Sequence, residues 1–134
     1  MKITFILPAI GKKQGEKYLK SWLMEPLTIA VLSSLVSSEW EREFYDDRIE
    51  KINYETDSDL VLITVETYTA KRAYFIANEF RKRGKTVVLG GYHVTLVPEE
   101  AEEYADSIMC GNAEQIIRPL LNDFKSGNLQ KKYV

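Results

Sequence analysis

The sequence predicts a three-layer α/β fold, in which helices cover both faces of a doubly wound parallel sheet of five strands. Short apolar runs alternate along the chain with segments of helical periodicity, which favours strand–helix–strand units. One run, LVLITV at 60–65, is apolar throughout, as is typical of a strand covered on both faces. The length of 134 residues, with 45% hydrophobic residues, suits one domain with a single core.

The first half of the chain predicts two strands and a helix. Residues 3–7 form a short β-rich run, and residues 8–15 carry a proline and two glycines, which indicate a loop. Pro26 fits a first helical turn, and apolar residues recur at helical spacing after it, so a helix is expected over 26–37. Over residues 39–44, Trp40, Arg42 and Phe44 alternate with glutamates, which favours an edge strand.

The second half predicts three strands and three helices. The buried run 60–65 should be the central strand; Thr69 can cap the helix that follows, and Gly84 should end it. The remaining elements are a strand at 86–89, a short acidic helix from Pro98, a strand at 107–110 and a helix from 112 or 114 to 124. Pro119 is expected within the first turn of that last helix, where amides lack partners.

An edge-like second strand beside a buried third suggests the strand order 2-1-3-4-5, which is the flavodoxin-like arrangement. In such sheets ligands bind beyond the carboxyl ends of the strands, near the point where the strand order reverses. Four loops therefore define the candidate site: residues 8–15, 66–69, 90–96 and 111–114. In the third loop, Gly90 and Gly91 remove side chains where a ligand can approach the backbone.

Composition and motifs exclude several functions. A net charge of −2 gives no broad attraction to nucleic acid or to an anionic membrane, and the lone Cys110 fits a reducing cytoplasm. The chain has no GxGxxG, phosphate-binding or GxSxG motif, and no acceptor aspartate at the end of the third strand. A flavin-binding protein of the same fold stays a weaker alternative, because the first loop is long and bears lysines.

Three segments resemble the amino-terminal cobalamin-binding domain of B12-dependent radical SAM enzymes. They are MEPLTIAVLSSL, the stretch from DLVLITVETYTAK to LGGYHVTLVPEEA, and ADSIMCGNAEQIIRPLLNDF. The most specific element is GGxHxT, at Gly90, Gly91, His93 and Thr95, followed by PEEA. The resemblance covers nearly the whole chain.

The resemblance implies that the corrin ring lies across the strand ends and that its nucleotide tail enters beside the sheet. Gly90 and Gly91 would line the tail, and the Thr95 hydroxyl would meet its polar atoms. The cofactor-binding residues so implied are Pro8, Ala9, Thr64, Glu66, Thr67, Tyr68, Thr69, Gly90, Gly91, Tyr92, His93, Thr95, Gly111, Asn112 and Glu114.

Two departures from the family pattern concern the tail and the metal. The family often has GEGE after the fifth strand, whereas Asn112 and Ala113 replace its middle residues here. The first loop lacks the DxHxxG motif of methionine-synthase-type domains, whose histidine binds cobalt. We therefore expect base-off cobalamin without a histidine ligand from this chain, no metal ligand at all, and His93 as a hydrogen-bonding loop residue.

The chain lacks the CxxxCxxC motif of radical SAM enzymes, because one cysteine cannot hold a four-iron cluster. We expect residues 1–126 to be the cobalamin-binding domain and 127–134 to begin a linker to a catalytic domain. That domain would bring the iron–sulfur cluster and S-adenosylmethionine, and the parent would be an enzyme that performs methyl transfer or related radical chemistry. The alternative from another class is a docking or gating module that keeps the fold without the cofactor.

Overall fold

The computed structural model describes residues 1–10 and 24–134 and contains one parallel sheet with the order β2-β1-β3-β4-β5-β6. The central strands β1, β3 and β4 pair in register, with Phe5 opposite Leu62 and Leu62 opposite Val88. The strands are β1 (Lys2–Leu7), β2 (Glu41–Asp46), β3 (Leu60–Thr64), β4 (Thr86–Gly90), β5 (Ser107–Met109) and β6 (Lys132–Tyr133). The predicted parallel α/β fold and the order of its first five strands are confirmed.

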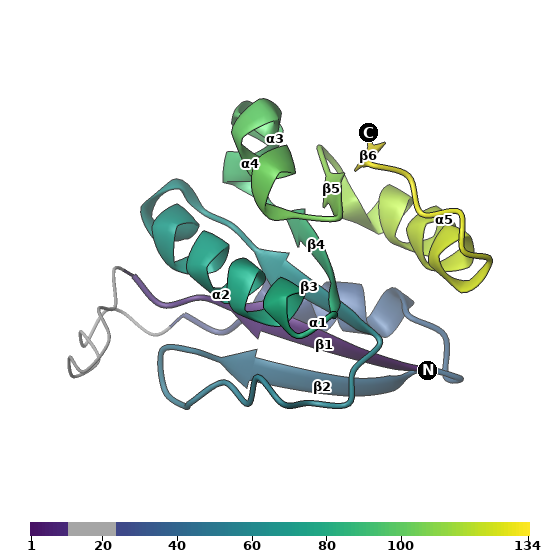
Figure 1. The fold of residues 1–134 in the computed structure, drawn as a ribbon, viewed down its shortest axis with the longest axis horizontal. Coiled ribbons are helices and arrows are strands. Elements are labelled where there is room, and N and C mark those ends of the chain that lie inside the picture. Colours follow the sequence, from purple (N-terminus) through teal and green to yellow (C-terminus); the bar gives the residue numbers. More distant parts are fainter. Residues whose placement is uncertain (11–23) are drawn as a thin grey trace.

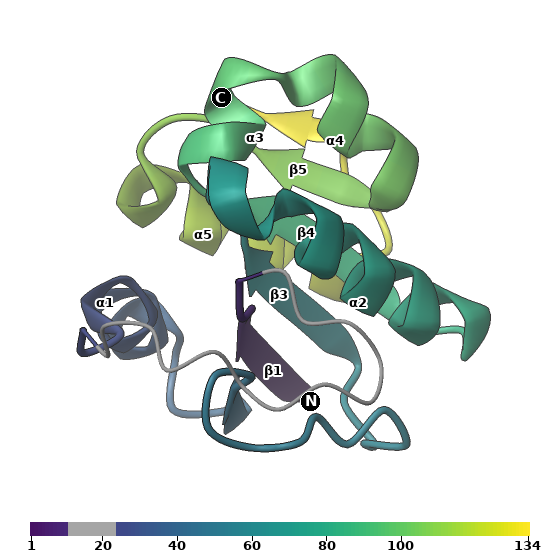
Figure 2. The ribbon, with the colours of Figure 1, turned by 90° about the vertical axis from the view of Figure 1, so that its left-hand side faces the viewer.

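Helices cover both faces of the sheet, which gives three layers (Figure 1). Figure 2, which looks onto the carboxyl ends of the strands, shows α1 and α5 on one side and α2 on the other. The helices are α1 (Leu27–Leu35), α2 (Ala70–Lys82), α3 (Tyr92–Leu96), α4 (Pro98–Tyr104) and α5 (Ala113–Lys125), and a 3-10 turn, η1 (Thr67–Thr69), precedes α2.

Alternation along the strands divides the core into two halves. Ile6, Ile63 and Leu89 face α2, α3 and α4, while Phe5 and Leu62 face α1 and α5. Strands β1, β3 and β4 are apolar on both faces because helices cover both, as the run at 60–65 predicted. The carboxyl ends of these strands are thereby held at one edge of a rigid core.

The edge strand lies where predicted, beside β1, but two residues further along the chain. The alternation placed it at 39–44, whereas β2 runs from Glu41 to Asp46. Trp40 is only 3% exposed because it packs in the core beside α5, 6.1 Å from the Phe124 ring. The shift brings Asp46 to the carboxyl end of the strand and Asp47 directly after it, at the level of the other strand ends.

The carboxyl-terminal half differs from expectation at two places. Residues 127–134 were expected to begin a linker, and within them Lys132 and Tyr133 form β6, a sixth strand parallel to β5. Pro119 was expected in a first helical turn, but α5 begins at Ala113, so the proline lies in the helix interior. The structure also differs locally at two loops, because residues 92–96 form α3 and Thr69 ends η1 without capping α2 through its side chain.

Candidate functional site

The predicted site residues come together at one edge, because they follow β1, β3, β4 and β5, whose carboxyl ends lie side by side. Residues 11–15 of the first predicted loop lie outside the described residues. The exposed members are Thr67, Tyr68, Tyr92, Thr95, Gly111, Asn112 and Glu114. Thr64, Glu66, Gly91 and His93 are partly exposed, and Pro8, Ala9, Thr69 and Gly90 are buried.

The glycine pair after β4 fits closely against neighbouring protein atoms. Gly91 has φ +117, and a Cβ at this position would lie 2.8 Å from the carbonyl oxygen of Val65. That contact is fixed from both sides: the Val65 amide donates to the Gly90 carbonyl (2.8 Å), and the His93 amide donates to the Val65 carbonyl (3.1 Å). Glycine at 91 therefore lets the start of α3 approach the end of β3.

Gly90 leaves space on the opposite face of the sheet, which carries α1 and α5. A Cβ at Gly90 would lie 3.0 Å from the terminal methyl of Met109, which is 3% exposed. The volume freed by the missing side chain is thus filled by a long, unbranched side chain from β5. Methionine changes rotamer easily, so this is the one side of the glycine pair where space opens by a side-chain movement alone.

His93 joins three elements. Its Nδ1 lies 3.2 Å from the Thr67 hydroxyl of η1, and its Nε2 lies 3.4 Å from the Glu100 carboxylate of α4. The imidazole is 12% exposed, and its centre is 6.3 Å from that of the Tyr74 ring. Both ring nitrogens have protein partners, in agreement with a hydrogen-bonding role for this residue.

Thr95 links α3 to the turn after β5. Its hydroxyl donates to the Gly91 carbonyl (3.0 Å) and accepts the Gly111 amide (2.9 Å). Gly111 has φ +88, and a Cβ there would meet nothing within 4 Å. Ala113, which replaces a glycine of the family pattern, begins α5 and is not among the residues with positive φ.

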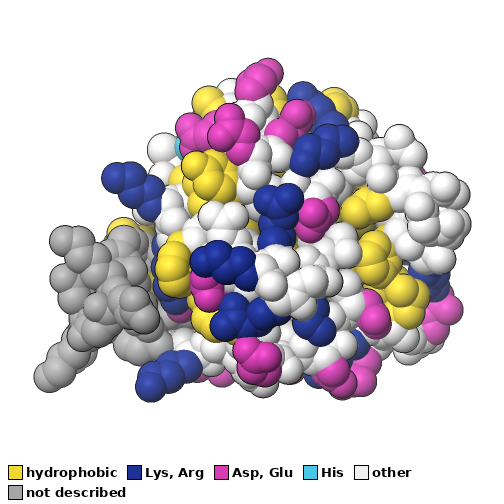
Figure 3. Space-filling model, viewed as in Figure 1, with side chains coloured by type: hydrophobic (Ala, Val, Ile, Leu, Met, Phe, Trp, Pro, Cys, Tyr) yellow, Lys and Arg dark blue, Asp and Glu magenta, His cyan; other side chains and the backbone are white. Residues whose placement is uncertain are grey.

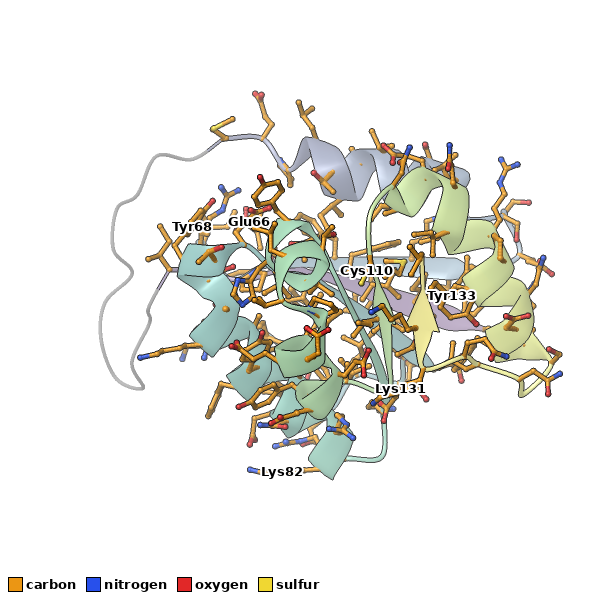
Figure 4. The ribbon with its side chains drawn as sticks, turned by 90° about the horizontal axis from the view of Figure 1, so that it is seen from above. Glu66, Tyr68, Lys82, Cys110, Lys131 and Tyr133 are labelled. Atoms are coloured by element: carbon orange, nitrogen blue, oxygen red, sulfur yellow. The ribbon has the colours of Figure 1, made fainter. Side chains whose placement is uncertain are left out.

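The turn after β3 places one acid and one aromatic ring at the same end of the molecule (Figure 4). The Thr69 hydroxyl accepts the Glu66 amide (3.0 Å) and donates to the Glu66 carbonyl, which fixes this turn. Burial raises the pKa of the Glu66 carboxyl, and nearby His93 partly offsets the rise. Tyr68 points outward and is 65% exposed.

Sequence reasoning missed Asp47, which binds the backbone at the end of β1 and directly after it. This aspartate is buried, its Oδ2 accepts the Ala9 amide (2.9 Å), and its own amide donates to the Leu7 carbonyl (3.0 Å). Arg72 of α2 binds both carboxylate oxygens, through Nε (2.8 Å) and Nη2 (2.7 Å). The signal in the sequence is an acidic pair, Asp46-Asp47, directly after an edge strand, but the alternation of Trp40 with glutamates places that strand two residues too early.

Four large apolar side chains at this edge are exposed to solvent. Tyr68 is 65% exposed and Tyr92 is 67% exposed. Their chain neighbours, Thr67 and His93, are in hydrogen-bond contact, which brings the two tyrosine-bearing segments together. Ile10 after β1 and Leu96 in α3 are 37% and 59% exposed. Acidic side chains gather over α4, at the top of Figure 3.

Two surface hollows lie elsewhere. One, with a volume of about 160 Å³, separates the start of α5 from β6 and includes Asn112 of the predicted site. The other, about 330 Å³, runs between α1 and β2 and is lined by Phe5, Ile29 and Phe44 among others. Neither hollow is lined by the residues that end β3 and β4.

Within the described ranges, no group of three or more histidine, cysteine or acidic residues is arranged to hold a metal ion. Cys110, labelled in Figure 4, is buried on β5's side of the core, and burial raises the pKa of its thiol. Among the helices described, none has the length and apolar character needed to cross a membrane.

No family model matches the chain, but three known proteins do. Over 80% of its length it is 46% identical to bacteriochlorophyllide d C-8(2)-methyltransferase of Chlorobaculum tepidum, and over 81% it is 31% identical to the C-12(1)-methyltransferase of the same organism. An uncharacterized methyltransferase of Pyrococcus horikoshii is 27% identical over 95% of the chain. The chain spans only about a quarter of the first two relatives and 30% of the third. It is homologous to one part of these methyltransferases.

Proposed function

We propose that this chain is the cobalamin-binding domain of a B12-dependent radical SAM methyltransferase. The observation that carries the proposal is the exposed apolar platform at the carboxyl ends of β1, β3 and β4, formed by Ile10, Tyr68, Tyr92 and Leu96. Exposed apolar groups gathered at one site mark a binding surface, and this edge is where doubly wound sheets bind ligands. Homology to part of known methyltransferases supports the same assignment.

The residues of the platform suit a corrin ring, which is broad and largely apolar. Tyr68 and Tyr92 offer aromatic faces, and Thr67 and Glu66 offer polar atoms beside them. The Thr67–His93 contact fixes the two tyrosine-bearing turns relative to each other, so the surface is ordered before a ligand arrives.

The nucleotide tail would enter beside Gly90, on the face between α1 and α5. Here the Met109 methyl occupies the space that the glycine leaves, so the tail can enter only when this side chain rotates away. Thr95 would meet the tail with its second lone pair, because its proton and one lone pair already serve Gly91 and Gly111.

We propose that the cobalt receives no histidine from this chain. The first loop has no histidine, and both nitrogens of His93 already have partners in Thr67 and Glu100. Cobalamin, when bound, supplies a cobalt centre that carries a methyl group, while this domain binds and orients it. S-adenosylmethionine and a four-iron cluster would belong to another part of the parent enzyme, and its tetrapyrrole substrate class is suggested by the relatives' names.

Mixing the 134-residue chain with hydroxocobalamin, desalting and recording the visible spectrum tests the proposal. We expect retained cobalamin with the spectrum of the base-off form. Replacing both platform tyrosines, Tyr68→Ala with Tyr92→Ala, should weaken binding at least tenfold. Phe44→Ala, which removes a 37% exposed aromatic ring in the middle of β2, is the matched control and should bind as the unchanged chain does.

A second candidate function is a docking module that keeps this fold without cobalamin. At Gly91 the close approach of Val65 requires a glycine, and at Gly90 the Met109 side chain already fills the free space. Both glycines are thus explained without a ligand, which favours the docking module. The same desalting experiment separates the two, since a docking module would retain no cobalamin at any tested concentration.

A further inference from the structure

We infer that Asp47 is a positioning residue that holds residues 8–10, which follow β1, in the conformation that places Ile10 on the platform for the cofactor, with Arg72 as its counter-ion. The inference deepens the proposed function and rests on it. The loop begins at Pro8 and Ala9, which are buried, and reaches the exposed Ile10 of the platform one residue later. The conformation of these three residues decides where the Ile10 side chain lies on the platform.

Asp47 and Arg72 together hold the Ala9 amide, and we call this pair the anchor. The carboxylate is 1% exposed and accepts three hydrogen bonds, two from Arg72 and one from the Ala9 amide. A buried carboxylate requires such partners, and the bidentate guanidinium fixes its orientation as well as its charge. With the carboxylate held this way, Oδ2 is presented to one backbone amide of the loop.

The anchor spans three strands. Asp47 follows β2, Ala9 follows β1, and Arg72 lies in the first turn of α2, which follows β3. In the sheet, β1 lies between β2 and β3, so the Asp47–Arg72 pair crosses the carboxyl end of β1. The backbone at Ala9 is therefore held by an ion pair between the two elements that flank β1.

A neighbouring pair of the same kind lacks this contact. Arg48 binds both oxygens of Asp46 (2.8 and 2.7 Å) and donates to the Met24 carbonyl (2.9 Å). Within the described part of the chain, the Asp46 carboxylate accepts its hydrogen bonds from Arg48 and none from residues 8–10, although its burial is similar to that of Asp47. Asp46–Arg48 is thus a comparison pair for the effect of removing one carboxylate and one guanidinium on the Ala9 amide, while Arg48 also lies near enough to Tyr68 for their charges to interact.

The experiment compares neutral replacements of the two pairs. Removing one partner leaves a buried charge unpaired and endangers folding, whereas replacing both with apolar residues of similar volume often preserves stability. We would measure hydroxocobalamin affinity, the spectrum of the bound form and thermal unfolding for Asp47→Leu with Arg72→Met, and for Asp46→Leu with Arg48→Met. Exchange of the Ala9 amide proton, followed by NMR without ligand, reports the anchor directly.

We expect the Asp47/Arg72 variant to unfold within a few degrees of the unchanged chain, to exchange the Ala9 amide at least tenfold faster, and to bind hydroxocobalamin at least tenfold more weakly. The Asp46/Arg48 variant should match the unchanged chain in exchange of the Ala9 amide and should lose less affinity than the Asp47/Arg72 variant. If the Asp47/Arg72 variant does not fold, Asp47→Asn takes its place, because the smaller change keeps one oxygen for Arg72.

Three results would overturn the inference, and they differ in whether the proposed function also fails. Equal affinity in the Asp47/Arg72 variant, with tight binding by the unchanged chain, removes the positioning role but keeps the proposed function. Equal weakening by both paired variants shows a general loss of order at this edge. Absence of binding by the unchanged chain removes the proposed function, and the inference with it.

Discussion

At the scale of the residue, Gly91 is required by the protein's own backbone, whatever ligand the edge receives. Its φ of +117 and the 2.8 Å approach to the Val65 oxygen both exclude a side chain. Gly91→Ala should therefore destabilise the chain by more than about 2 kcal/mol, measured by urea unfolding.

Gly111→Ala is the control for Gly91→Ala. It has the same positive-φ strain but open space around the new Cβ, so we expect about 1 kcal/mol. Equal losses at both glycines would show that backbone strain alone, and not the contact with Val65, decides the effect.

Glu66 gives a pH-dependent prediction. Burial raises the pKa of its carboxyl above the unfolded value, so the folded state holds the proton more tightly and loses stability as pH rises through the folded pKa. Glu66→Gln removes this loss and should increase the free energy of unfolding at pH 7 relative to the unchanged chain, but not at pH 4. Urea unfolding at both pH values measures the difference; a gain of the same size at pH 4 would contradict burial of the charged carboxylate as the cause.

Residue patterns identified some of this site and missed other parts. The glycine pair and His93 stand out in the sequence because glycine doublets and a lone histidine are rare signals at strand ends. Asp47 and Arg72 do not stand out, since they are 25 residues apart and meet only because β1 lies between β2 and β3. Contacts of this kind depend on the order of strands and not on local spacing.

At the scale of the element, β6 makes the tail part of the fold. The Lys131 and Tyr133 carbonyls accept the amides of Ile108 and Cys110, and the Tyr133 hydroxyl donates to Asp123 (2.8 Å). A chain ending at Gly127 should lose about 2–4 kcal/mol of stability in thermal or urea unfolding.

Tyr133→Phe separates the contributions of β6. It removes the hydrogen bond that the hydroxyl donates to Asp123 and the one that it accepts from the Gln130 amide (3.0 Å), and should cost about 1–2 kcal/mol. If the shortened chain were as stable as the full one, residues 127–134 would behave as the linker that the sequence suggested.

Pro119 provides a gain-of-stability prediction. In the interior of α5 it cannot donate to the Gln115 carbonyl, so Pro119→Ala restores one helical hydrogen bond and should add about 1 kcal/mol. Arg118→Ala, at the exposed preceding position, should leave the free energy of unfolding nearly unchanged. Loss of stability in Pro119→Ala would mean that the helix is bent around the proline in a way that alanine cannot follow.

Elements whose apolar residues repeat with the period of a helix or a strand were predictable, whereas β6 and η1 were not. The helices α2 and α5 and the strand β3 show their pattern over several residues, because each buries a whole face or both faces. A strand of two residues and a turn of three carry no period, so their formation depends on the edge of β5 and on the Thr69 hydroxyl.

At the scale of the whole molecule, the two parts of cobalamin should be bound by different parts of the domain. The ring would lie on the platform and the tail between α1 and α5, beside Gly90. Cobinamide, which lacks the nucleotide tail, should therefore bind more weakly than cobalamin and raise the unfolding temperature less. At 100 times its dissociation constant, a ligand stabilises the folded state by about 2.7 kcal/mol.

Met109→Leu tests the tail separately. A branched side chain turns away from Gly90 less readily, so this variant should lose affinity for cobalamin but keep its affinity for cobinamide. Titrations followed by visible absorbance measure both. Equal affinities of the unchanged chain for the two ligands would show that the tail does not enter the domain.

The Asp47–Arg72 pair also joins distant parts of the chain. One carboxylate binds both the Ala9 amide after β1 and the Arg72 guanidinium in the first turn of α2, so separating these two elements would break a buried ion pair. At the far end of α2, Arg83 binds Glu55 and lies over the Tyr54 ring, 5.3 Å from its centre. Helix α2 therefore carries a charged contact at each end, one with the residues after β2 and one with residues 54 and 55 before β3.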